Sequence, residues 1–415
     1  MNERPSPLVG VQIAIIGGCG HVGLPLGVKL ALAGASTTLI DIDETAVASV
    51  NAGRFPFLEH GGDAQLAQVV GRTLRATSDA NACHAVDAVI FVVGTPVDEH
   101  LNPWLSGLFK VFDDFLARVS QNSLVIMRST LFPGTMKHLL ERTRRSGKTV
   151  RLAFCPERVA EGHALDEIDG LPQIVAAFDQ ESFEAAYRLF AAIAPAVIRL
   201  SVEEAEMAKL MTNSWRYLEF AIANQFYMIA QASGLDFHRL YQAIRYDYPR
   251  AASFKAPGFA AGPCLLKDTM QLGSHYKHQF TLGNSAMFIN EGLAVCVVDG
   301  ATARLGGELW GRTVGLLGMT FKADSDDTRE SLSFRVKKGL EFKGARVLYN
   351  DPYLAGSVPI EELDTISDLL ILCTPHREYR DLHLVKPCLD VWGIFDPVTL
   401  EILPGTRTPV GRTSP

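Results

Sequence analysis

The chain has 415 residues, of which 47% are hydrophobic and 20% are charged, and its formal net charge is -7. A chain of this length exceeds the usual size of one compact core, so we expect two or three globular domains. The acidic balance argues against a nucleic-acid-binding surface and against an anionic membrane as a partner.

The amino-terminal segment and the cysteines indicate a cytoplasmic protein. Residues 1–10, MNERPSPLVG, lack the basic and apolar regions of a secretory signal. No uninterrupted apolar run approaches the length that spans a bilayer, so we expect no membrane partner. The seven cysteines are scattered and form no C-x-x-C pair, which argues against a disulfide framework and a zinc site. We therefore expect reduced thiols and no bound metal.

The first part of the chain alternates short apolar runs with helical spacing. Four runs rich in Val and Ile predict buried strands: VQIAIIGG at 11–18, STTLIDID at 36–43, DAVIFVVGT at 87–95 and NSLVIMRST at 122–130. Between the first two, HVGLPLGVKLALAGA at 21–35 has helical spacing. Strands that alternate with helices predict a parallel, doubly wound sheet.

A glycine fingerprint follows the first of these strands. Gly18, Gly20 and Gly23 form G-x-G-x-x-G where a helix begins, a pattern that lets backbone approach a pyrophosphate at a helix N-terminus. We expect the first glycine to permit the tight turn and the third to let helix and strand pack closely. Asp41 ends the second strand, where a carboxylate binds ribose hydroxyls and repels a 2′-phosphate. The pattern predicts NAD as the cofactor.

The middle of the chain predicts one long helix. Residues 201–234 open with Ser201 and Glu204 in a capping-box arrangement and close on Gly234. From Phe220 to Leu235 the sequence carries no charge, so we expect this half to be buried on nearly every side. A helix of this kind between two domains predicts a spine and half of a homodimer interface.

The α/β pattern resumes near the carboxyl end. Four further runs predict a second open sheet without a glycine fingerprint: TVGLLGMTF at 313–321, ARVLYND at 345–351, SDLLILCTP at 367–375 and CLDVWGIF at 388–395. We expect two Rossmann-like doubly wound parallel-sheet domains, residues 1–200 and 306–403, joined by the central helical domain 201–305. Residues 404–415 are polar and rich in Pro and Gly, and we expect them to be disordered.

Four separated stretches carry polar residues suited to chemistry. Each has a simpler explanation alone: Thr130 satisfies a strand end, Glu157 and Glu161 form a solvated loop, Lys209 pairs with Glu204 or Glu206 on a helix surface, and Cys264 is a small buried residue. The functional alternative rests on position, because Lys209 and Asn213 share one helix face and Lys267 and Asp268 closely follow Cys264.

Taken in order, these stretches resemble the nucleotide-sugar 6-dehydrogenases, the UDP-glucose/GDP-mannose dehydrogenase family. The resemblance covers nearly the whole chain and is carried by GGCGHVGLP, VGTP, RSTLFPGT, CPERVAEG, AEMAKLMTNSWR, GPCLLKD and LGMTFKADSDDTRES. It implies a C6 alcohol of a nucleoside-diphosphate sugar oxidised to a carboxylate in two hydride transfers to NAD⁺. It also implies a cysteine adduct of the aldehyde, its oxidation to a thioester and hydrolysis by water.

The resemblance implies a role for each matched residue. Cys264 is the nucleophile, and the charges of Lys209 and Lys267 favour its thiolate. Lys209 and Asn213 donate to the sugar C6 oxygen as it gains negative charge. Asp268 and Thr130 hold a water for proton transfer. The carboxylate that assists thioester hydrolysis is Glu157.

Further residues match the binding positions of the family. The resemblance places Thr95, Thr130, Glu161, Lys267 and Arg329 beside the cofactor. It places Glu157, Glu161, Lys209, Asn213, Gly262 and Lys322 beside the substrate, with the C-terminal domain binding its nucleotide end. Arg250 lies where some members send an arginine into the neighbouring subunit's active site.

Three positions depart from the family pattern and bear on the substrate. Ala261 stands where members often have the first of two glycines, and Trp392 stands where many have a substrate-contacting arginine in a D-x-R stretch. Glu161 is retained where N-acetylhexosamine enzymes commonly have proline. The residue Trp392 argues against an ordinary UDP-glucose enzyme, whereas the retained Glu161 argues for one. We favour a glucose-type donor over an N-acetylhexosamine, with UDP and dTDP both open.

Two other functions compete with this prediction. A β-hydroxyacid or 6-phosphogluconate-type dehydrogenase also joins a Rossmann domain to long helices, but it needs neither the cysteine nor a second sheet. A non-catalytic NAD-binding scaffold would keep the fold, yet the intact set of Cys264, Lys209, Asn213 and Asp268 argues against it.

Overall fold

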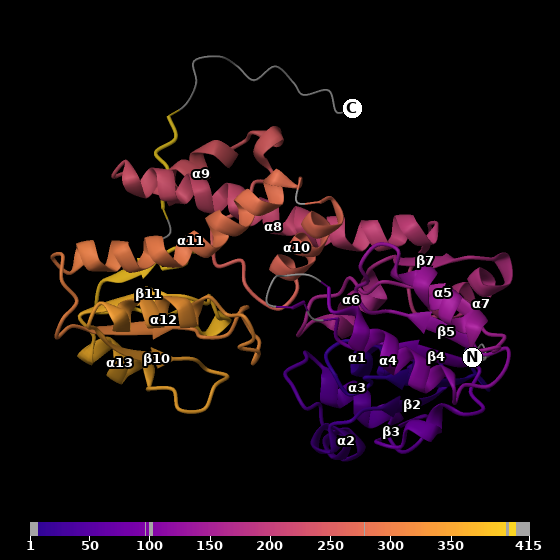
Figure 1. Cartoon of the computed structure of the whole chain (residues 1–415). Helices are drawn as coiled ribbons and strands as arrows, with labels where there is room; N and C mark the ends of the chain where they lie inside the picture. The colour runs from indigo at the N-terminus through magenta and orange to yellow at the C-terminus, as the bar shows by residue number, and fades with distance from the viewer. Residues whose placement is uncertain (1–6, 96, 99–102, 278, 396–397, 404–415) are drawn as a thin grey trace.

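The computed structural model describes residues 7–95, 97–98, 103–277, 279–395 and 398–403. Two α/β lobes lie side by side, and the long helix α8 (Val202–Ala232) runs along one side of both (Figure 1). The predicted fold class, two parallel-sheet domains joined by a long helix, is confirmed. The predicted disorder of 404–415 falls outside the described residues.

The first lobe contains an eight-stranded sheet in the order β3-β2-β1-β4-β5-β6-β7-β8. Its strands are β1 Gln12–Ile16, β2 Ser36–Ile40, β3 Leu74–Thr77, β4 Ala88–Phe91, β5 Leu124–Met127, β6 Arg151–Phe154, β7 Gln173–Ala177 and β8 Val197–Arg199. All neighbours are parallel except β6 and β7, which are antiparallel. The four predicted strands are therefore β1, β2, β4 and β5, at the centre of the sheet.

Helices cover both faces of this sheet. They are α1 Gly23–Leu32, α2 Glu44–Asn51, α3 Gly62–Val69, α4 Leu105–Leu116, α5 Thr135–Arg145, α6 Ala164–Gly170 and α7 Gln180–Ala191, with a 3-10 turn at Ala80–Cys83. Leu24 of α1 and Phe190 of α7 belong to one core cluster, whereas Phe112 of α4 and Leu139 of α5 belong to another. Two cores on opposite faces are the sign of a doubly wound domain.

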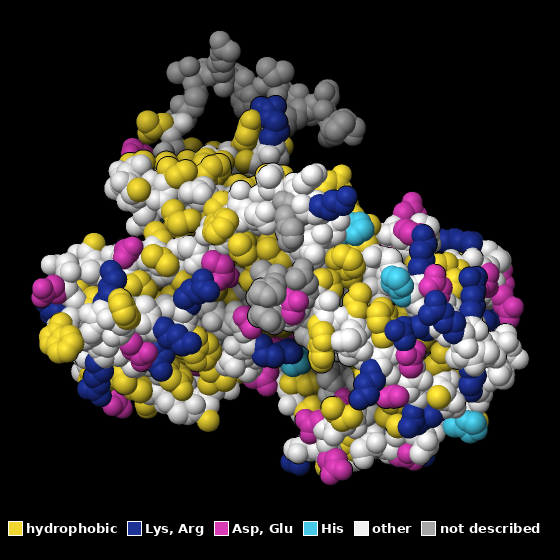
Figure 2. Space-filling model, viewed as in Figure 1, with side chains coloured by type: hydrophobic (Ala, Val, Ile, Leu, Met, Phe, Trp, Pro, Cys, Tyr) yellow, Lys and Arg dark blue, Asp and Glu magenta, His cyan; other side chains and the backbone are white. Residues whose placement is uncertain are grey.

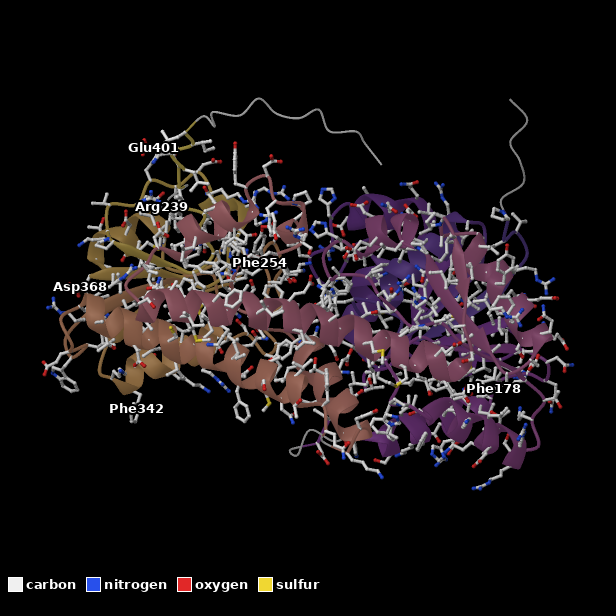
Figure 3. All side chains as sticks on the ribbon, turned by 90° about the horizontal axis from the view of Figure 1, so that it is seen from above. Phe178, Arg239, Phe254, Phe342, Asp368 and Glu401 are labelled. Atoms are coloured by element: carbon white, nitrogen blue, oxygen red, sulfur yellow. The ribbon has the colours of Figure 1, made fainter. Side chains whose placement is uncertain are left out.

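The long helix begins and ends as the sequence predicts. Ser201 Oγ accepts a hydrogen bond from the Glu204 amide at 3.3 Å, and Glu204 Oε2 accepts one from the Ser201 amide at 2.8 Å. The helix has 31 residues, a length of about 46 Å, and Gly234 beyond it has a φ of +67°. Figure 3 shows it crossing from one lobe to the other.

The apolar half of α8 is not buried on every side within one chain, so that expectation is wrong for the single subunit. Ile222, Phe226 and Ile229 are 47%, 49% and 53% exposed. Apolar side chains also gather over the upper rim of the molecule, where α9 (Phe237–Arg245) lies (Figure 2). One face of the central helices therefore remains uncovered.

The remaining central elements pack on α8. These are the 3-10 turn Pro249–Ala251, α10 Leu265–His275 and α11 Thr281–Arg304. Within the described residues, α11 alone is long and apolar enough to cross a membrane by length and composition. It packs against α8 and supplies Leu293, Val297 and Ala301 to the core of the second lobe, and core helices often have this composition.

The second lobe is built on four parallel strands in the order β10-β9-β11-β12. Its elements are β9 Thr313–Leu317, α12 Ser333–Phe342, β10 Arg346–Asn350, α13 Ile360–Ile366, β11 Leu369–Leu372, a 3-10 turn at Arg377–Tyr379 and β12 Cys388–Asp390. Helices α11 and α12 contribute to the core on one face of the sheet, and α13 contributes to the other. The second predicted sheet is confirmed.

Candidate active site

Cys264 is the one exposed cysteine among the seven. It caps the N-terminus of α10 and follows the loop from Gly258 to Pro263. The partial positive charge at a helix N-terminus stabilises the thiolate form of a cysteine placed there. In contrast, Cys155 lies fully buried beyond β6, and burial raises its pKa to about 12. Position and exposure therefore distinguish Cys264 as the candidate nucleophile.

Helices α8 and α10 bring four of the predicted residues together. Asp268 on α10 is fully buried, and its Oδ2 accepts a hydrogen bond from Asn213 Nδ2 on α8 at 2.6 Å. Lys267 Nζ lies 2.9 Å from Asp268 Oδ1. Lys209 is buried one helical turn before Asn213, on the same face of α8. The two separated stretches thus form one polar cluster in an otherwise apolar setting.

Burial shifts the proton affinities in this cluster. The pKa of Lys209 is lowered, chiefly by burial, while Asp268 and Cys264 oppose the shift. Although the Cys264 side chain reaches solvent, the protein atoms packed around it desolvate the thiol and, with Asp268, raise its pKa; Lys267 and Lys209 lower it as the sequence predicts. The two lysines therefore act in the predicted direction, while desolvation and Asp268 act against them.

The simpler surface-pair explanation for Lys209 does not hold. Glu204 is engaged in the capping box of α8. Glu206 accepts hydrogen bonds from the backbone amides of Gly134 at 2.7 Å and Met136 at 2.8 Å, at the start of α5. Burial raises the pKa of Glu206, and these two amides act against that rise. Glu206 thus fastens the loop that follows β5 to α8.

The predicted residues Thr130 and Glu157 lie on loops after neighbouring strands. Thr130 is half-buried after β5. Glu157, after β6, is buried and forms an ion pair with Arg128. Glu157 Oε1 also accepts hydrogen bonds from the amides of Arg158 at 2.6 Å and Val159 at 3.0 Å. These contacts hold the Glu157 side chain in a fixed orientation.

Arg128 is a site residue that the sequence reasoning did not single out. Its side chain is fully buried, donates to the Cys155 carbonyl at 3.1 Å and to Gln173 Oε1 at 3.0 Å, and lies 4.9 Å above the Phe190 ring. The available signal was an arginine inside the apolar run LVIMRST. A charge that ends a buried strand requires a buried partner, and here Glu157 provides it.

Contacts between the two lobes involve Glu161, Lys322 and Arg329. Lys322 Nζ donates to the Glu161 carbonyl at 2.8 Å, and the Arg329 guanidinium lies 3.3 Å from Glu161 Oε1. Arg329 also binds both carboxylate oxygens of Asp327. Burial, opposed by Arg329, raises the pKa of Glu161 to about 7. The C-terminal domain therefore reaches the loop after β6 through two cations.

His21, Glu161 and Asp327 form a compact polar group beside these cations. Their ligand atoms lie within 4.8 Å of one another, a spacing that a metal ion can also use. Arg329 already pairs with both carboxylates, so it supplies positive charge to this group. We therefore interpret the group as an ion-pair network between the domains.

The glycine loop between β1 and α1 fits a dinucleotide. A Cβ on Gly23 would lie 2.6 Å from the Gly17 carbonyl oxygen, so strand and helix meet too closely for a side chain. A Cβ on Gly20 would meet no atom nearer than 3.9 Å, which leaves open space for a phosphate group. Asp41 Oδ2 accepts a hydrogen bond from the Cys19 amide at 2.9 Å, so the acidic strand end adjoins the loop.

Two adjacent glycines, Gly17 and Gly18, form the tight turn after β1. Gly17, just before the predicted first glycine, has a φ of +74° and takes the left-handed conformation in the turn. Gly18 is required for another reason, since a Cβ there would lie 2.7 Å from Leu39 Cβ. Gly17 therefore supplies the left-handed backbone of the turn, and Gly18 allows the loop to approach β2 closely.

The other predicted residues are distributed around this centre. Thr95 is half-buried beyond β4, and Gly262 is buried just before Cys264. Arg250 is exposed, and its Nε donates to the Tyr248 hydroxyl at 2.7 Å in the turn after α9. None of the hydrogen bonds or ion pairs found among the described residues joins Arg250 to Cys264, Lys209 or Asp268. Within one chain the structure does not bring Arg250 to the cluster.

Trp392 lies in a different setting from a substrate-facing arginine. It is partly buried between two core clusters, and its Nε1 donates to the Cys373 carbonyl at 3.0 Å. The departure from the family pattern therefore replaces a charged group by an aromatic side chain bound to its own domain.

Sequence models for three domains of one family match consecutive parts of the chain. The NAD binding domain of the UDP-glucose/GDP-mannose dehydrogenase family matches residues 11–194, its central domain matches 203–292, and its UDP binding domain matches 315–397. Together the three matches cover most of the chain and follow the same order as the lobes described above.

Individual relatives match over most of their length. The UDP-N-acetyl-D-mannosamine dehydrogenase of Pyrococcus horikoshii is 28% identical over 90% of this chain and 91% of its own. The UDP-glucose 6-dehydrogenase YwqF of Bacillus subtilis is 28% identical over 82% of this chain and 80% of its own. The solved structure of a UDP-glucose dehydrogenase from Pyrobaculum islandicum has a TM-score of 0.86 at 26% identity, covering 96% of this chain and 97% of that one.

Proposed function

The chain belongs to the UDP-glucose/GDP-mannose dehydrogenase family, and from this premise we propose that it oxidises the C6 alcohol of a nucleoside-diphosphate hexose to the uronate. The observation that carries the proposal is the cluster in which Cys264, Lys209, Asn213 and Asp268 meet at the junction of α8 and α10. The matching UDP binding domain argues against a hydroxyacid dehydrogenase, and the intact cluster argues against a non-catalytic scaffold.

The first oxidation removes a hydride from C6 and a proton from its hydroxyl group. Bound NAD⁺ supplies the hydride acceptor, once for each of the two oxidations. Gly20 and Gly23 would hold its pyrophosphate, and Asp41 its adenosine ribose. Thr95, Thr130, Glu161, Lys267 and Arg329 would complete this side of the site, as the family pattern implies.

Lys209 and Asn213 would hold the sugar C6 oxygen. Because burial lowers the pKa of Lys209, its amine can give up and take back a proton near neutral pH more readily than a surface lysine. Asn213 is oriented by Asp268 at 2.6 Å, which leaves its second amide hydrogen to donate to the C6 oxygen.

Cys264 would then add to the aldehyde carbon. The sulfur forms the new C–S bond, the thiol proton passes to a nearby base, and the carbonyl oxygen is protonated to give a thiohemiacetal. Loss of the second hydride and of the hydroxyl proton gives a thioester. The raised pKa of Cys264 makes a base necessary for this step, and Lys209 or a water held by Asp268 is placed to serve.

Hydrolysis of the thioester needs a water molecule and a negative charge to orient it. We assign the water to Thr130 and Asp268 and the supporting charge to Glu157, which pairs with Arg128. Water attacks the carbonyl carbon, the C–S bond breaks, and the cysteine thiol is regenerated with the carboxylate product. Two NADH are released for each sugar oxidised.

For the donor we propose UDP-glucose. Glu161, kept where N-acetylhexosamine enzymes commonly have proline, supports a glucose-type sugar, and the match to a UDP binding domain supports uridine over thymidine. Lys322 and Gly262 would contact this substrate. A UDP-N-acetylhexosamine is the second candidate, because the Pyrococcus horikoshii relative named for UDP-N-acetyl-D-mannosamine is as similar as the UDP-glucose relative.

We further propose a homodimer in the cytoplasm, built on the exposed apolar face of α8. Ile222, Phe226 and Ile229 are half-exposed there, beside Leu240 and Ile244 of α9. A second copy placed by two-fold symmetry would cover these side chains. The same association is what would be needed to bring Arg250 to a neighbouring active site.

The test is a panel of nucleoside-diphosphate hexoses incubated with NAD⁺ and followed by NADH absorbance. We expect two NADH per UDP-glucose consumed and a slower reaction with the dTDP and N-acetylhexosamine analogues. A response only to hydroxyacids would identify the other dehydrogenase class, and no response to any compound would favour a scaffold. One NADH per sugar would contradict the four-electron reaction.

A further inference from the structure

The loop that carries Cys264 is wedged between the central helices and the C-terminal domain. Gly258 at its start is buried, and a Cβ at this position would lie 2.2 to 2.5 Å from three ring carbons of Trp392. The backbone of Gly258 lies outside the left-handed region, so an L-residue is excluded by Trp392 and not by φ. The six-membered ring of the indole thus rests directly on the backbone of the loop.

The opposite side of Gly258 is held by a buried amide pair. Asn224 on α8 accepts from the Gly258 amide at 2.8 Å and donates to the Gly258 carbonyl at 3.0 Å. Asn290 on α11 accepts from Asn224 at 2.9 Å, and both asparagines are fully buried. Because each polar group has a partner, this side of the loop has little freedom to move.

Trp392 is itself fixed to the C-terminal sheet. Its Nε1 donates to the Cys373 carbonyl, which directly follows β11. The Asp390 carboxylate at the end of β12 accepts from the amides of Trp392, Gly393, Ile394 and Phe395 at 2.6 to 3.0 Å. Four amides on one carboxylate fix the turn that carries the indole, so the ring moves with the sheet.

The C-terminal domain touches the loop a second time, next to the nucleophile. A Cβ on Gly262 would lie 2.4 Å from the Phe321 ring, and Gly262 has a φ of +96°. Gly262 also donates its amide to the Glu330 carbonyl at 3.3 Å. Two aromatic side chains of one domain therefore hold the segment from Gly258 to Gly262, immediately before Cys264.

We propose that Trp392 is a positioning residue for the reaction assigned above: it acts through Gly258 and sets the place of Cys264 relative to Lys209 and Asn213. Displacement of the C-terminal sheet that carries the nucleotide end of the substrate would move the indole and with it the cysteine loop. The proposal rests on the proposed function, since it assigns to Cys264 the covalent steps.

A direct contact of Trp392 with the substrate is the competing explanation. The structure favours positioning, because the only indole donor is already bound to Cys373 and the ring carbons face Gly258. Because both the N–H donor and one edge of the ring already contact the protein, the indole offers few groups that could bind a ligand. A substrate contact would alter KM, whereas displacement of the nucleophile alters kcat.

The experiment is a double-mutant cycle on Gly258→Ala and Trp392→Ala, with Trp310→Ala as the control because Trp310 is 84% exposed on the same domain. Two quantities are measured: steady-state kcat and KM, and the rate at which iodoacetamide labels Cys264, read by peptide mass spectrometry without substrate. The rate of Cys264 labelling does not depend on turnover. It therefore tests whether Trp392 positions the cysteine even if the protein does not catalyse the proposed reaction. Circular dichroism confirms folding.

We expect Gly258→Ala alone to lower kcat at least about tenfold and to change the labelling rate at least about threefold. In the Trp392→Ala background, the same change should have less than about threefold effect on either quantity, because the clash is gone. If Trp392→Ala does not fold, the cycle is repeated with Trp392→Phe, because the phenylalanine ring is smaller than the indole. Equal effects of Gly258→Ala in both backgrounds, or a Trp392 effect confined to KM with unchanged labelling, would overturn the proposal.

Discussion

Replacement of Glu206 by glutamine tests how the loop that carries Thr130 is held against α8. Glu206 is 1% exposed and accepts hydrogen bonds from the amides of Gly134 and Met136 at 2.7 and 2.8 Å. In Glu206→Gln one acceptor oxygen becomes an NH₂ group that faces a backbone donor. A hydrogen bond to a charged group contributes about 1.5–3 kcal/mol, and the stranded N–H costs about 1–3 kcal/mol. Together these two contributions predict a loss of about 2.5–6 kcal/mol in the free energy of unfolding.

The assay is urea denaturation followed by tryptophan fluorescence, together with hydrogen exchange at the Met136 amide. Glu203→Gln is the matched control on the same helical turn, because in the described part of the chain the ion-pair partner of Glu203 is the exposed Lys137, and the loss of a surface pair should change little. Glu206→Gln should lower the urea midpoint and speed exchange at Met136, whereas Glu203→Gln should do neither. Equal midpoints for both variants, with unchanged exchange, would refute the reasoning.

Three further predictions concern pH, cofactor and assembly. Glu161 has its pKa raised from 4.5 to about 7 by burial, so its proton stabilises the folded chain below pH 4.5 and this contribution is lost as the pH rises through 7. The Tm of wild type minus that of Glu161→Gln should therefore become lower between pH 5 and 8, and a difference that does not change with pH would contradict the assignment. Asp41→Asn should narrow the preference for NAD⁺ over NADP⁺ by at least about tenfold, because repulsion of a 2′-phosphate is removed; equal preference ratios would count against Asp41. Phe226→Asp should convert a dimer to monomers in sedimentation, and a monomeric wild type at micromolar concentration would exclude the proposed interface.

The sequence was sufficient for the two parallel sheets and the long helix between them, and it supplied the candidate residues whose roles are proposed above. Buried parallel strands are continuous apolar runs, so β1, β4 and β5 could be predicted from composition, and the capping box located the start of α8 to the residue. Cys264, Lys209 and Asn213 stood out because they occur in ordered motifs whose spacing is fixed by the loops and helices that carry them.

The supporting residues could not be predicted in the same way. Arg128, Glu206 and Trp392 act on partners that lie 29, 72 and 134 residues away, on other elements, and their own neighbours in the sequence give little sign of it. The pKa of Cys264 depends not only on the two lysines that the sequence places nearby but also on desolvation by surrounding protein atoms, which the sequence does not show. Such properties depend on how the lobes pack.

The covalent role of Cys264 is tested most directly by Cys264→Ser with NAD⁺ and the nucleotide sugar, followed by product analysis and intact-protein mass spectrometry. Serine keeps the size of the side chain but forms its anion far less readily than cysteine near neutral pH. The variant should still perform the first hydride transfer, releasing a trace of aldehyde or accumulating a slow adduct. Its rate of uronate formation should fall by more than about 100-fold.

Cys155→Ala serves as the control for the same measurement. Because Cys155 is fully buried, this substitution should leave the rate of uronate formation within a few fold of wild type. Alkylation of the wild type should abolish turnover, and bound sugar nucleotide should protect against it. The proposed mechanism predicts two NADH per sugar for wild type and Cys155→Ala, and a stalled reaction for Cys264→Ser. Uronate formation by Cys264→Ser at nearly the wild-type rate would contradict it.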